Sequence, residues 1–376
     1  MTASSEPATT SSAQMTTSPA PARLSAPTLD MHTHFFPDGL DNLAESTGDS
    51  RWPSLLVNPD GSARIMRGNE LFRPVAASCW NLERRAEAMD ALGIDHHVLS
   101  PVPVNLTTWA DPKLAAKFIR AHNEGFASAV ANGPSGRFSW IGSVPLQHSA
   151  LATAELEFCV ANYDMTGVEI GSEVGGVELD HPSLEPFWSA VEDLDVAVFI
   201  HPTDGAGAIR RSGVPYEFAI GMLTDTAMAV TALVFGGVMD RHPRLRVGLA
   251  HGCGTFPWAY PRIARGATLS PGAATPTDVL AHCDGLVRRL WADTLVFDPA
   301  HMPLLIERFG ADHLMLGSDY PFYPPAFGDA LDIIDASVDC GHCSAEAGRA
   351  MYGDNARRFL RMTDSETGSP PIIAGV

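Results

Sequence analysis

Short apolar runs alternate with longer helical patterns along most of the chain. Runs rich in Val, Ile, Leu and Phe fit buried strands, and segments whose apolar residues recur every three or four positions fit amphipathic helices. Strands are predicted at 28–32, 95–100, 138–144, 167–170, 197–201, 246–251, 290–293 and 314–318. Helices are predicted between them, most clearly at 81–92, 111–132, 183–194, 225–243 and 299–310.

Strands that alternate with helices in this way predict the α/β class. Eight such strands in one chain favour a (β/α)8 TIM-type barrel. The alternative is an open, doubly wound sheet, but no G-x-G-x-x-G sequence follows any predicted strand to support it.

One region breaks the alternation. Residues 38–80 contain Gly, Pro, Asp and Asn with scattered aromatic residues and no clear period, so we predict an insertion after the first strand. Because loops at the carboxyl ends of barrel strands build the active site, this insertion is expected to be a lid or a wall of the substrate pocket. The barrel is expected to span 28–363, between a disordered leader at 1–27, rich in Ser, Thr, Ala and Pro, and a C-terminal tail at 364–376.

Composition narrows the choice of partners. The chain has 376 residues, of which 45% are hydrophobic and 18% charged, as is typical of soluble globular proteins. Its net charge of −19 argues against nucleic acid or an anionic membrane as a partner. The longest apolar stretches, such as 228–239, are too short or too broken to span a bilayer. Six thinly spread cysteines predict reduced thiols and a cytoplasmic location.

Polar residues stand at the carboxyl ends of several predicted strands. His32 and His34 are separated by one residue, so both side chains face the same side of a strand. His201 ends the fifth predicted strand, His251 ends the sixth, and Asp319 follows the eighth. Any one of them alone could cap a loop. Together they predict one site, because a barrel gathers the carboxyl ends of its strands at one face.

The residue types at this predicted site suit a divalent metal. Three imidazoles and one carboxylate are typical ligands of Zn²⁺. We assign His32, His34, His201 and Asp319 as ligands of one Zn²⁺ per chain, with Mn²⁺ and Fe²⁺ as alternatives. His251 is assigned to proton transfer beside a metal-bound water, and Asp319 is expected to accept a hydrogen bond from that water.

Several segments resemble one known family. "DMHTHFFP", "LFRPV", "MDALGID", "VPLQ", "HGCGTF" and "MLGSDYPF" occur in the order typical of the amidohydrolase superfamily. They are most similar to its 2-amino-3-carboxymuconate-6-semialdehyde decarboxylase branch, which is related to γ-resorcylate decarboxylase. The resemblance covers about residues 29–360. It implies a mononuclear Zn²⁺ enzyme that removes a carboxylate as carbon dioxide without redox chemistry.

The resemblance also implies substrate contacts. The family arginine that binds the substrate carboxylate corresponds to Arg73, and a second arginine, which crosses a homodimer interface to the neighbouring site, corresponds to Arg262. Phe322 is expected to contact the substrate as well. Two positions depart from the family: Thr203 stands where a tryptophan is usual, and Cys253 where a glycine is usual. The departure at Thr203 is expected to enlarge or re-polarise the pocket.

A second metal is also considered. Some members of the superfamily bridge two metals with a carboxylated lysine after the fourth strand. Lys113 and Lys117 are the only lysines, and both lie in one predicted helix, which excludes that bridge. Glu169 in "GVEIG" stays open as a bridge, because strand alternation does not say which way it points.

The expected function is therefore a decarboxylase. Its substrate would be a small unsaturated or aromatic carboxylic acid that carries an amino or hydroxy group, and carbon dioxide would leave after protonation of the carbon that bears the carboxylate. An alternative with the same site is a zinc-hydroxide hydrolase, lactonase or hydratase. A non-catalytic metal-binding scaffold on the same barrel is the alternative from a different class.

Overall fold

The strands of the chain form a closed barrel. The computed structural model describes residues 23–203, 207, 209–211, 213–214, 216–270, 274–322 and 330–362. Within these residues, parallel pairing joins β1, β5 and β6 in one sheet and β7 to β11 in a second. Parallel bridges from Gly142 to Val168 and from Thr33 to Tyr320 connect the two sheets. The predicted (β/α)8 TIM-type barrel is therefore confirmed.

All eight predicted barrel strands are present, and each begins within one residue of the predicted start. They are β1 (Leu29–Phe35), β5 (His96–Pro101), β6 (Phe138–Trp140), β7 (Gly167–Ile170), β8 (Ala197–Ile200), β9 (Arg246–Leu249), β10 (Trp291–Asp293) and β11 (Leu314–Met315). Nearly every residue in them is buried, as expected for parallel strands that are covered on both faces.

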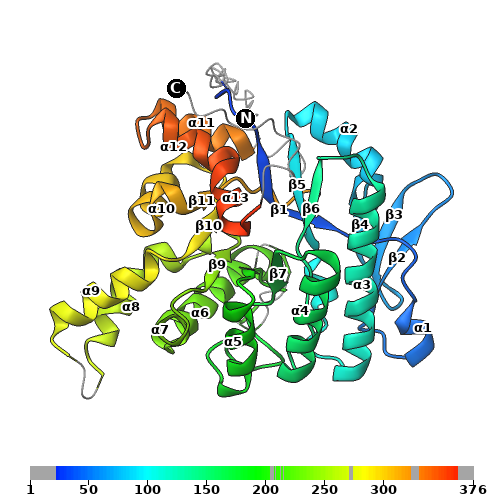
Figure 1. Cartoon of the computed structure of the whole chain (residues 1–376), viewed down its shortest axis with the longest axis horizontal. Helices are drawn as coiled ribbons and strands as arrows, with labels where there is room; N and C mark the ends of the chain where they lie inside the picture. Colours follow the sequence, from blue (N-terminus) through cyan, green and yellow to red (C-terminus); the bar gives the residue numbers. More distant parts are fainter. Residues whose placement is uncertain are drawn as a thin grey trace, which may run out of the picture.

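Helices surround the strands (Figure 1). They are α2 (Leu82–Leu92), α3 (Pro112–Asn132), α4 (Ser149–Tyr163), α5 (Glu185–Asp193), α6 (Met222–Phe235), α7 (Val238–Arg241), α8 (Phe256–Ala267), α9 (Pro276–Val287), α10 (Met302–Phe309), α11 (Ala330–Asp339), α12 (Ala345–Arg349) and α13 (Asn355–Leu360). Helix α13 covers the amino ends of the strands, since Arg246 at the start of β9 donates to the carbonyl of Phe359 (2.7 Å). That closure leaves the carboxyl ends as the open face.

The predicted insertion contains regular structure that the sequence did not reveal. It forms an antiparallel sheet of β2 (Pro53–Val57), β3 (Ala63–Arg67) and β4 (Glu70–Val75), preceded by α1 (Leu43–Thr47) and followed by the short helix η1 (Ala77–Cys79). We call residues 38–80 the lid. An apolar cluster of Phe36, Ile65, Cys79 and Val102 packs the lid against the barrel. The lid lies on the opposite side of the barrel from the projecting α8–α9 hairpin (Figure 1).

Other boundaries also differ from the prediction. Strand β1 continues to Phe35, so both histidines of the first motif lie inside the strand and not at its end. The helix predicted at 225–243 divides at Gly236 and Gly237, where Gly237 adopts a positive φ of 82°.

The predicted leader overlaps residues that contact the barrel, because Arg23 pairs with Asp332 of α11 (3.2 Å). Residues 1–22 and 363–376 lie outside the described residues, so most of the leader and the tail stay predictions.

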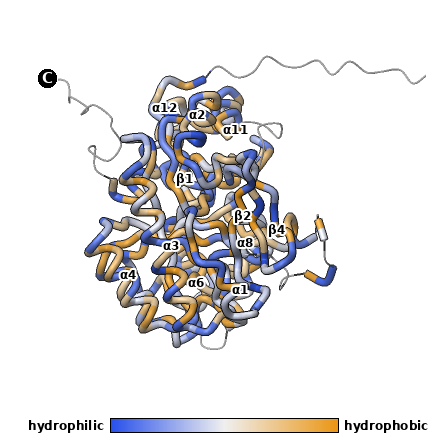
Figure 2. The backbone as a smooth tube through the Cα atoms, turned by 90° about the vertical axis from the view of Figure 1, so that its right-hand side faces the viewer, coloured by the Kyte–Doolittle hydropathy of each residue, from blue (hydrophilic) through white to orange (hydrophobic). Residues whose placement is uncertain are grey.

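One helical stretch is long and apolar enough to cross a membrane by length and composition alone. It covers Tyr216–Phe235, a π-helical segment (η5, Tyr216–Gly221) continued by α6, and its mean hydropathy is 1.7. Core helices commonly pass the same test, and α6 buries Val230 and Leu233 against the barrel. In Figure 2, hydrophobic and hydrophilic stretches alternate along the helices that face the viewer. All six cysteines are free.

The turn between β9 and α8 has an unusual backbone. His251, Gly252, Cys253 and Gly254 have φ values of 58°, 60°, 67° and 59°, a left-handed conformation that glycine adopts freely and other residues rarely do. Gly254 also leaves no room for a side chain, since a Cβ there would lie 2.1 Å from the carbonyl oxygen of Leu223. The positive φ at Cys253 is likewise a conformation that a glycine would adopt at lower cost.

The two glycines near α8 therefore respond in opposite ways to alanine. Gly254→Ala is expected to lower the free energy of unfolding by about 1–3 kcal/mol or more, because it adds both a steric clash and an unfavourable φ. Gly266→Ala, inside α8 with nothing within 4 Å of the added Cβ, should raise it by about 0.5–1 kcal/mol. Urea denaturation of both variants measures the difference, and equal effects would contradict this assignment of the turn.

Candidate metal centre

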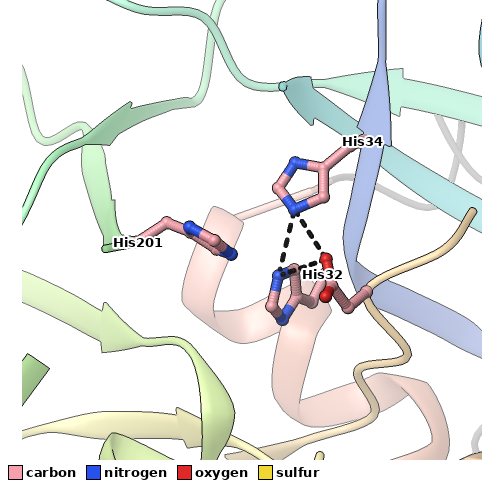
Figure 3. Close-up of side chains that lie close together, drawn as sticks. His32, His34 and His201 are labelled. Carbon is pink, nitrogen blue, oxygen red and sulfur yellow. Dashed lines mark hydrogen bonds and ion pairs between the residues drawn. The ribbon is translucent and has the colours of Figure 1, made fainter. Parts of the chain in front are cut away.

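Three histidines and one aspartate converge at the carboxyl end of the barrel. The candidate ligand atoms of His32, His34, His201 and Asp319 all lie within 4.8 Å of one another, and all four residues are buried. His32 Nε2 is 3.3 Å from His34 Nε2, and Asp319 Oδ1 is 2.9 Å from His34 Nε2. Figure 3 shows the rings of His32, His34 and His201 directed toward a common point. The residues predicted as metal ligands are thus brought together.

The outer nitrogen of each ring is held by an acceptor. His32 Nδ1 donates to the carboxylate of Asp293 (2.6 Å), His34 Nδ1 to the carbonyl of Pro101 (2.7 Å), and His201 Nδ1 to the carbonyl of Pro202 (2.7 Å). An acceptor at Nδ1 fixes the proton there and leaves the Nε2 lone pair free. All three Nε2 lone pairs are therefore directed inward, as in protein sites that bind metals through histidine.

Electrostatics favour the ligand form of three of these four groups. His34 differs: burial alone would lower its pKa, but the hydrogen bond with Asp319 and the carboxylate charges of Glu169 and Asp319 raise it. Burial, followed by the neighbouring histidines, holds the pKa of His201 well below its usual value, so its ring is neutral. Burial lowers the pKa of His32 as well. Burial alone would raise the pKa of Asp319, but its interactions with the nearby rings of His251, His34 and His32 bring it well below its usual value. Neutral imidazoles and an ionised carboxylate are the forms that bind a metal ion.

The site fits a divalent metal on its own geometry. His201 Nε2 is buried and has no hydrogen-bond partner among the described residues. A buried polar atom without a partner costs roughly 1–3 kcal/mol, so such atoms are rare unless something else satisfies them. A metal ion would satisfy this nitrogen and offset the repulsion among the converging lone pairs. Three nitrogens and one carboxylate oxygen are a donor set for Zn²⁺ and for similar first-row metals.

His251 stands beside this cluster but outside it. Its ring centroid is 4.9 Å from that of His201 and 5.2 Å from that of His32, and its Nε2 is 4.0 Å from Asp319 Oδ2. Its Nδ1 is buried without a hydrogen-bond partner among the described residues. The ring can therefore carry a proton to or from a reacting group next to the cluster.

Asp293 is a residue of the site that the sequence analysis missed. It ends β10, and its carboxylate accepts from His32 Nδ1 and from the backbone N–H groups of His251 (2.9 Å) and Gly252 (2.7 Å). One carboxylate thus orients a candidate ligand and anchors the left-handed turn that carries His251. Its position at a strand end was the available signal.

Glu169 points toward the site from β7. It is fully buried, and its Oε2 is 3.9 Å from Nδ1 of His34, the nitrogen that faces away from the cluster. Burial is the chief cause that raises its pKa to about 7. It is not among the four residues whose ligand atoms converge, so the arrangement gives no support to a bridge between two metals.

Arg73 lies above the cluster on β4 of the lid. Its guanidinium stacks between two aromatic rings, 4.6 Å from the centroid of Phe218 and 5.2 Å from that of Phe322. The Phe322 ring in turn lies 5.5 Å from the ring of His34. Stacking fixes the plane of the guanidinium and does not use its N–H groups. Two parallel N–H groups can therefore donate to the two oxygens of a carboxylate. Phe218 was not predicted, because no clear period marks its segment.

One hollow adjoins the centre through His251, and a second contains Thr203, which lies two positions after His201. A cavity of about 460 Å³ is lined almost entirely by apolar groups, including Phe218, Met222, Leu223, Leu295 and Leu304, together with His251. A more polar groove of about 520 Å³ lies under the lid and includes Arg51, Arg67 and Thr203. Thr203, two positions after the candidate ligand His201, therefore lines a groove together with lid residues, and its contact with a substrate stays a prediction.

Arg262, a predicted site residue, does not reach the cluster within its own chain. It is exposed on α8 and forms no hydrogen bond or ion pair with the residues of the site in the described part of the chain. Its predicted role requires a second copy of the chain.

Comparison with known proteins identifies similar sequences. The profile of the amidohydrolase family matches residues 29–362. The 2-amino-3-carboxymuconate-6-semialdehyde decarboxylase of Dictyostelium discoideum is 33% identical over 334 residues, which cover 88% of this chain and 91% of that protein. The γ-resorcylate decarboxylase of Rhizobium radiobacter is 28% identical over 295 residues, which cover 74% and 87% of the two chains.

Solved structures share the fold. The 5-carboxyvanillate decarboxylase of Sphingomonas paucimobilis superposes with a TM-score of 0.73 at 24% identity and covers 90% of this chain and 100% of its own. A dihydroxybenzoic acid decarboxylase of Polaromonas, solved with manganese, gives a TM-score of 0.67 at 22% identity, with coverage of 89% and 97%. At these identities the likeness supports the barrel fold.

Loss of the Asp293 carboxylate should weaken metal binding. In Asp293→Asn, a neutral amide replaces the carboxylate that accepts a hydrogen bond from His32 Nδ1. Replacement of such a partner typically lowers metal affinity about 10–100-fold. Asp298→Asn serves as the matched control, because Asp298 only caps an exposed short helix. Competition with a chelator measures both affinities. Equal values for the two variants would contradict the role of Asp293.

Proposed function

The chain belongs to the amidohydrolase family and is a carboxy-lyase, and we propose that it is a metal-dependent, non-oxidative decarboxylase. Its proposed substrate is an unsaturated or aromatic acid that carries an amino or hydroxy group. The observation that carries this proposal is the pairing of two elements. Four buried ligand atoms converge at the end of the barrel, and Arg73 is stacked above them between Phe218 and Phe322. A metal that polarises the substrate and an arginine that holds its carboxylate are what such a reaction requires.

The metal would be held by His32, His34, His201 and Asp319. We propose Zn²⁺, with Mn²⁺ and Fe²⁺ as alternatives, because mixed nitrogen and oxygen donors suit all three. When bound, it would supply a positive charge that stabilises the negative charge developed on the substrate oxygens.

The residues of the chain account for the remaining chemistry. Arg73 binds the substrate carboxylate through two parallel N–H bonds and aligns it over the cluster. His251 delivers a proton to the carbon that bears the carboxylate, which turns that carbon tetrahedral. The bond to the carboxylate then breaks, and its electron pair restores the conjugated π system as neutral carbon dioxide leaves. The amino or hydroxy group supports protonation by donating electron density to that carbon.

The hollows favour a planar, largely apolar substrate body. The cavity beside His251 has almost no charged lining, so it suits a conjugated chain or an aromatic ring. Substrates such as an aminocarboxymuconate semialdehyde or a hydroxybenzoate meet this description, and relatives named for both kinds of acid support it. Thr203 is proposed to tune the choice between them, since a small side chain leaves space that a tryptophan would fill.

We further propose a homodimer in which Arg262 completes the neighbouring site. Trp258 lies one helical turn before Arg262 on α8 and is 83% exposed. Leu269, at the end of the projecting hairpin, is also 83% exposed. Large apolar side chains exposed on one projecting element mark a surface that is buried by a partner, and this surface carries the arginine that does not reach its own site.

Metal content and carbon dioxide release test the catalytic proposal together. The purified protein is expected to hold about one divalent ion per chain and to release carbon dioxide from aminocarboxymuconate semialdehyde or from a hydroxybenzoate. His251→Asn should keep its metal and lose about 10²–10⁴-fold in rate, because His251 is not a ligand. His282→Asn, an exposed histidine paired with Asp240, is the control and should match the native protein. Metal without release from any acid of the panel would favour the hydrolase or hydratase alternative.

The homodimer can be tested by mixing two inactive variants. Arg262→Ala lacks the donated arginine, and His251→Asn lacks the proton donor. A heterodimer of the two has one intact site, so an equal, fully exchanged mixture should recover about a quarter of the native activity. Sedimentation of each variant checks that the dimer persists. A mixture that stays inactive, or a native protein that sediments as a monomer, would contradict the proposal.

A further inference from the structure

Arg85 of α2 is a fully buried arginine that the mechanism above does not use. It forms no ion pair with a carboxylate among the described residues, and its side chain has no solvent exposure. A buried charge of this kind is costly unless its donors are satisfied. The adjacent Arg84, by contrast, is exposed and pairs only with Glu87 on the surface (2.9 Å). The contacts of Arg85 therefore indicate what it does.

Two of its contacts hold the strand that carries the first two histidines. Nη2 of Arg85 donates to the backbone carbonyl of His34, and Nη1 donates to the hydroxyl of Thr33 (3.1 Å). The backbone N–H of His34 donates to the carbonyl of Tyr320 (2.7 Å), which follows Asp319 in the chain. Arg85 also stacks 5.0 Å from the Tyr320 ring. It thus contacts two of the three segments that bring ligands to the candidate metal centre, β1 and the segment that follows β11.

A third contact reaches the lid. Nε of Arg85 donates to the carbonyl of Ser78 in η1 (2.7 Å), and the Tyr320 hydroxyl donates to the hydroxyl of the same serine (2.8 Å). Helix η1 directly follows β4, the strand that carries Arg73. One guanidinium therefore bridges a strand that would bind the metal and the short helix that directly follows the strand carrying Arg73.

We propose that Arg85 is a positioning residue that links metal binding to the order of the lid. The proposal rests on the candidate metal centre described above. If one side chain holds β1, the segment after Asp319 and η1 in a single arrangement, a metal that fixes the first two also stabilises the third. By reciprocity, an ordered lid raises the affinity for the metal. A lysine could not make these bonds together, because its ammonium group ends a flexible chain and lacks the planar fork of N–H donors of a guanidinium.

Metal affinity tests the first half of this link. Competition between Zn²⁺ and a chelator is measured for the native protein, Arg85→Met, Arg85→Lys and the neighbour Arg84→Met. Arg85→Met keeps much of the side-chain volume without the donors and should lose about 10–100-fold in affinity. Arg85→Lys should lie between Arg85→Met and the native protein, and Arg84→Met should equal the native protein. Native affinity in Arg85→Met would overturn the proposal.

Hydrogen exchange of the lid tests the second half. In the native protein, removal of the metal should increase amide exchange in β4 and η1, and metal addition should reverse it. In Arg85→Met the exchange should already be fast and should respond little to the metal. An equal response in both proteins would overturn the link. If Arg85→Met fails to fold, Arg85→Lys gives the same comparison with a smaller expected change.

These measurements separate the inference from the proposed function. A native protein that takes up no metal would end both proposals. A native protein that binds Zn²⁺, with Arg85→Met equal to it in affinity and exchange, would end only the proposal for Arg85. Activity is not needed as a readout, so an unidentified substrate does not affect the outcome.

Discussion

The fixed direction of three imidazole rings is the constraint on which the site depends. An imidazole can present either nitrogen, and only a hydrogen bond at one of them selects the other. Asp293, Pro101 and Pro202 supply these bonds from three different places in the fold. Two of the acceptors are backbone carbonyls at strand ends, so the barrel itself orients the rings. The strand ends must therefore be held in register before any ligand geometry exists.

The carboxylate of Asp293 joins two parts of that geometry. It orients His32 and also binds the N–H groups of the turn at His251. The turn is left-handed over four residues, a conformation that costs free energy at His251 and Cys253. A buried anion that accepts several N–H bonds can offset such strain. Asp293 thus orients the candidate ligand His32 and also sets the position of His251, the proposed proton donor, relative to the cluster.

Much of the fold could be predicted because parallel barrel strands are buried on both faces. Their sequences are short apolar runs such as "AVFI" of β8, which stand out between amphipathic helices. His32, His34, His201, His251 and Asp319 were predictable because each lies in or just after such a run. The ligand geometry itself was not, since strand alternation gives the direction of a side chain but not the nitrogen that it presents.

The missed features share a physical reason, which is that tertiary contacts decide them. The hairpin of β2 and β3 is short, and its "NPDG" turn was the only local signal. Arg85 stands beside Arg84 in an amphipathic helix, where both resemble surface charges, yet only one is buried. Asp293 resembles an ordinary residue at the end of a strand. In each case the sequence supplies the residue, and the packing of distant segments supplies its role.

The candidate metal ligands and the residues proposed to contact the substrate lie in different parts of the fold. This separation affects how such a site can change its substrate. The candidate ligands and Asp293 lie on barrel strands, or directly after them, and every shift there disturbs several hydrogen bonds. Arg73 and the groove beside Thr203 are built largely from lid and loop residues, which carry fewer mutual constraints. The size of the side chain at position 203 therefore alters the space in this groove and leaves the directions of the rings unchanged. Specificity can vary in the lid while the barrel keeps the chemistry.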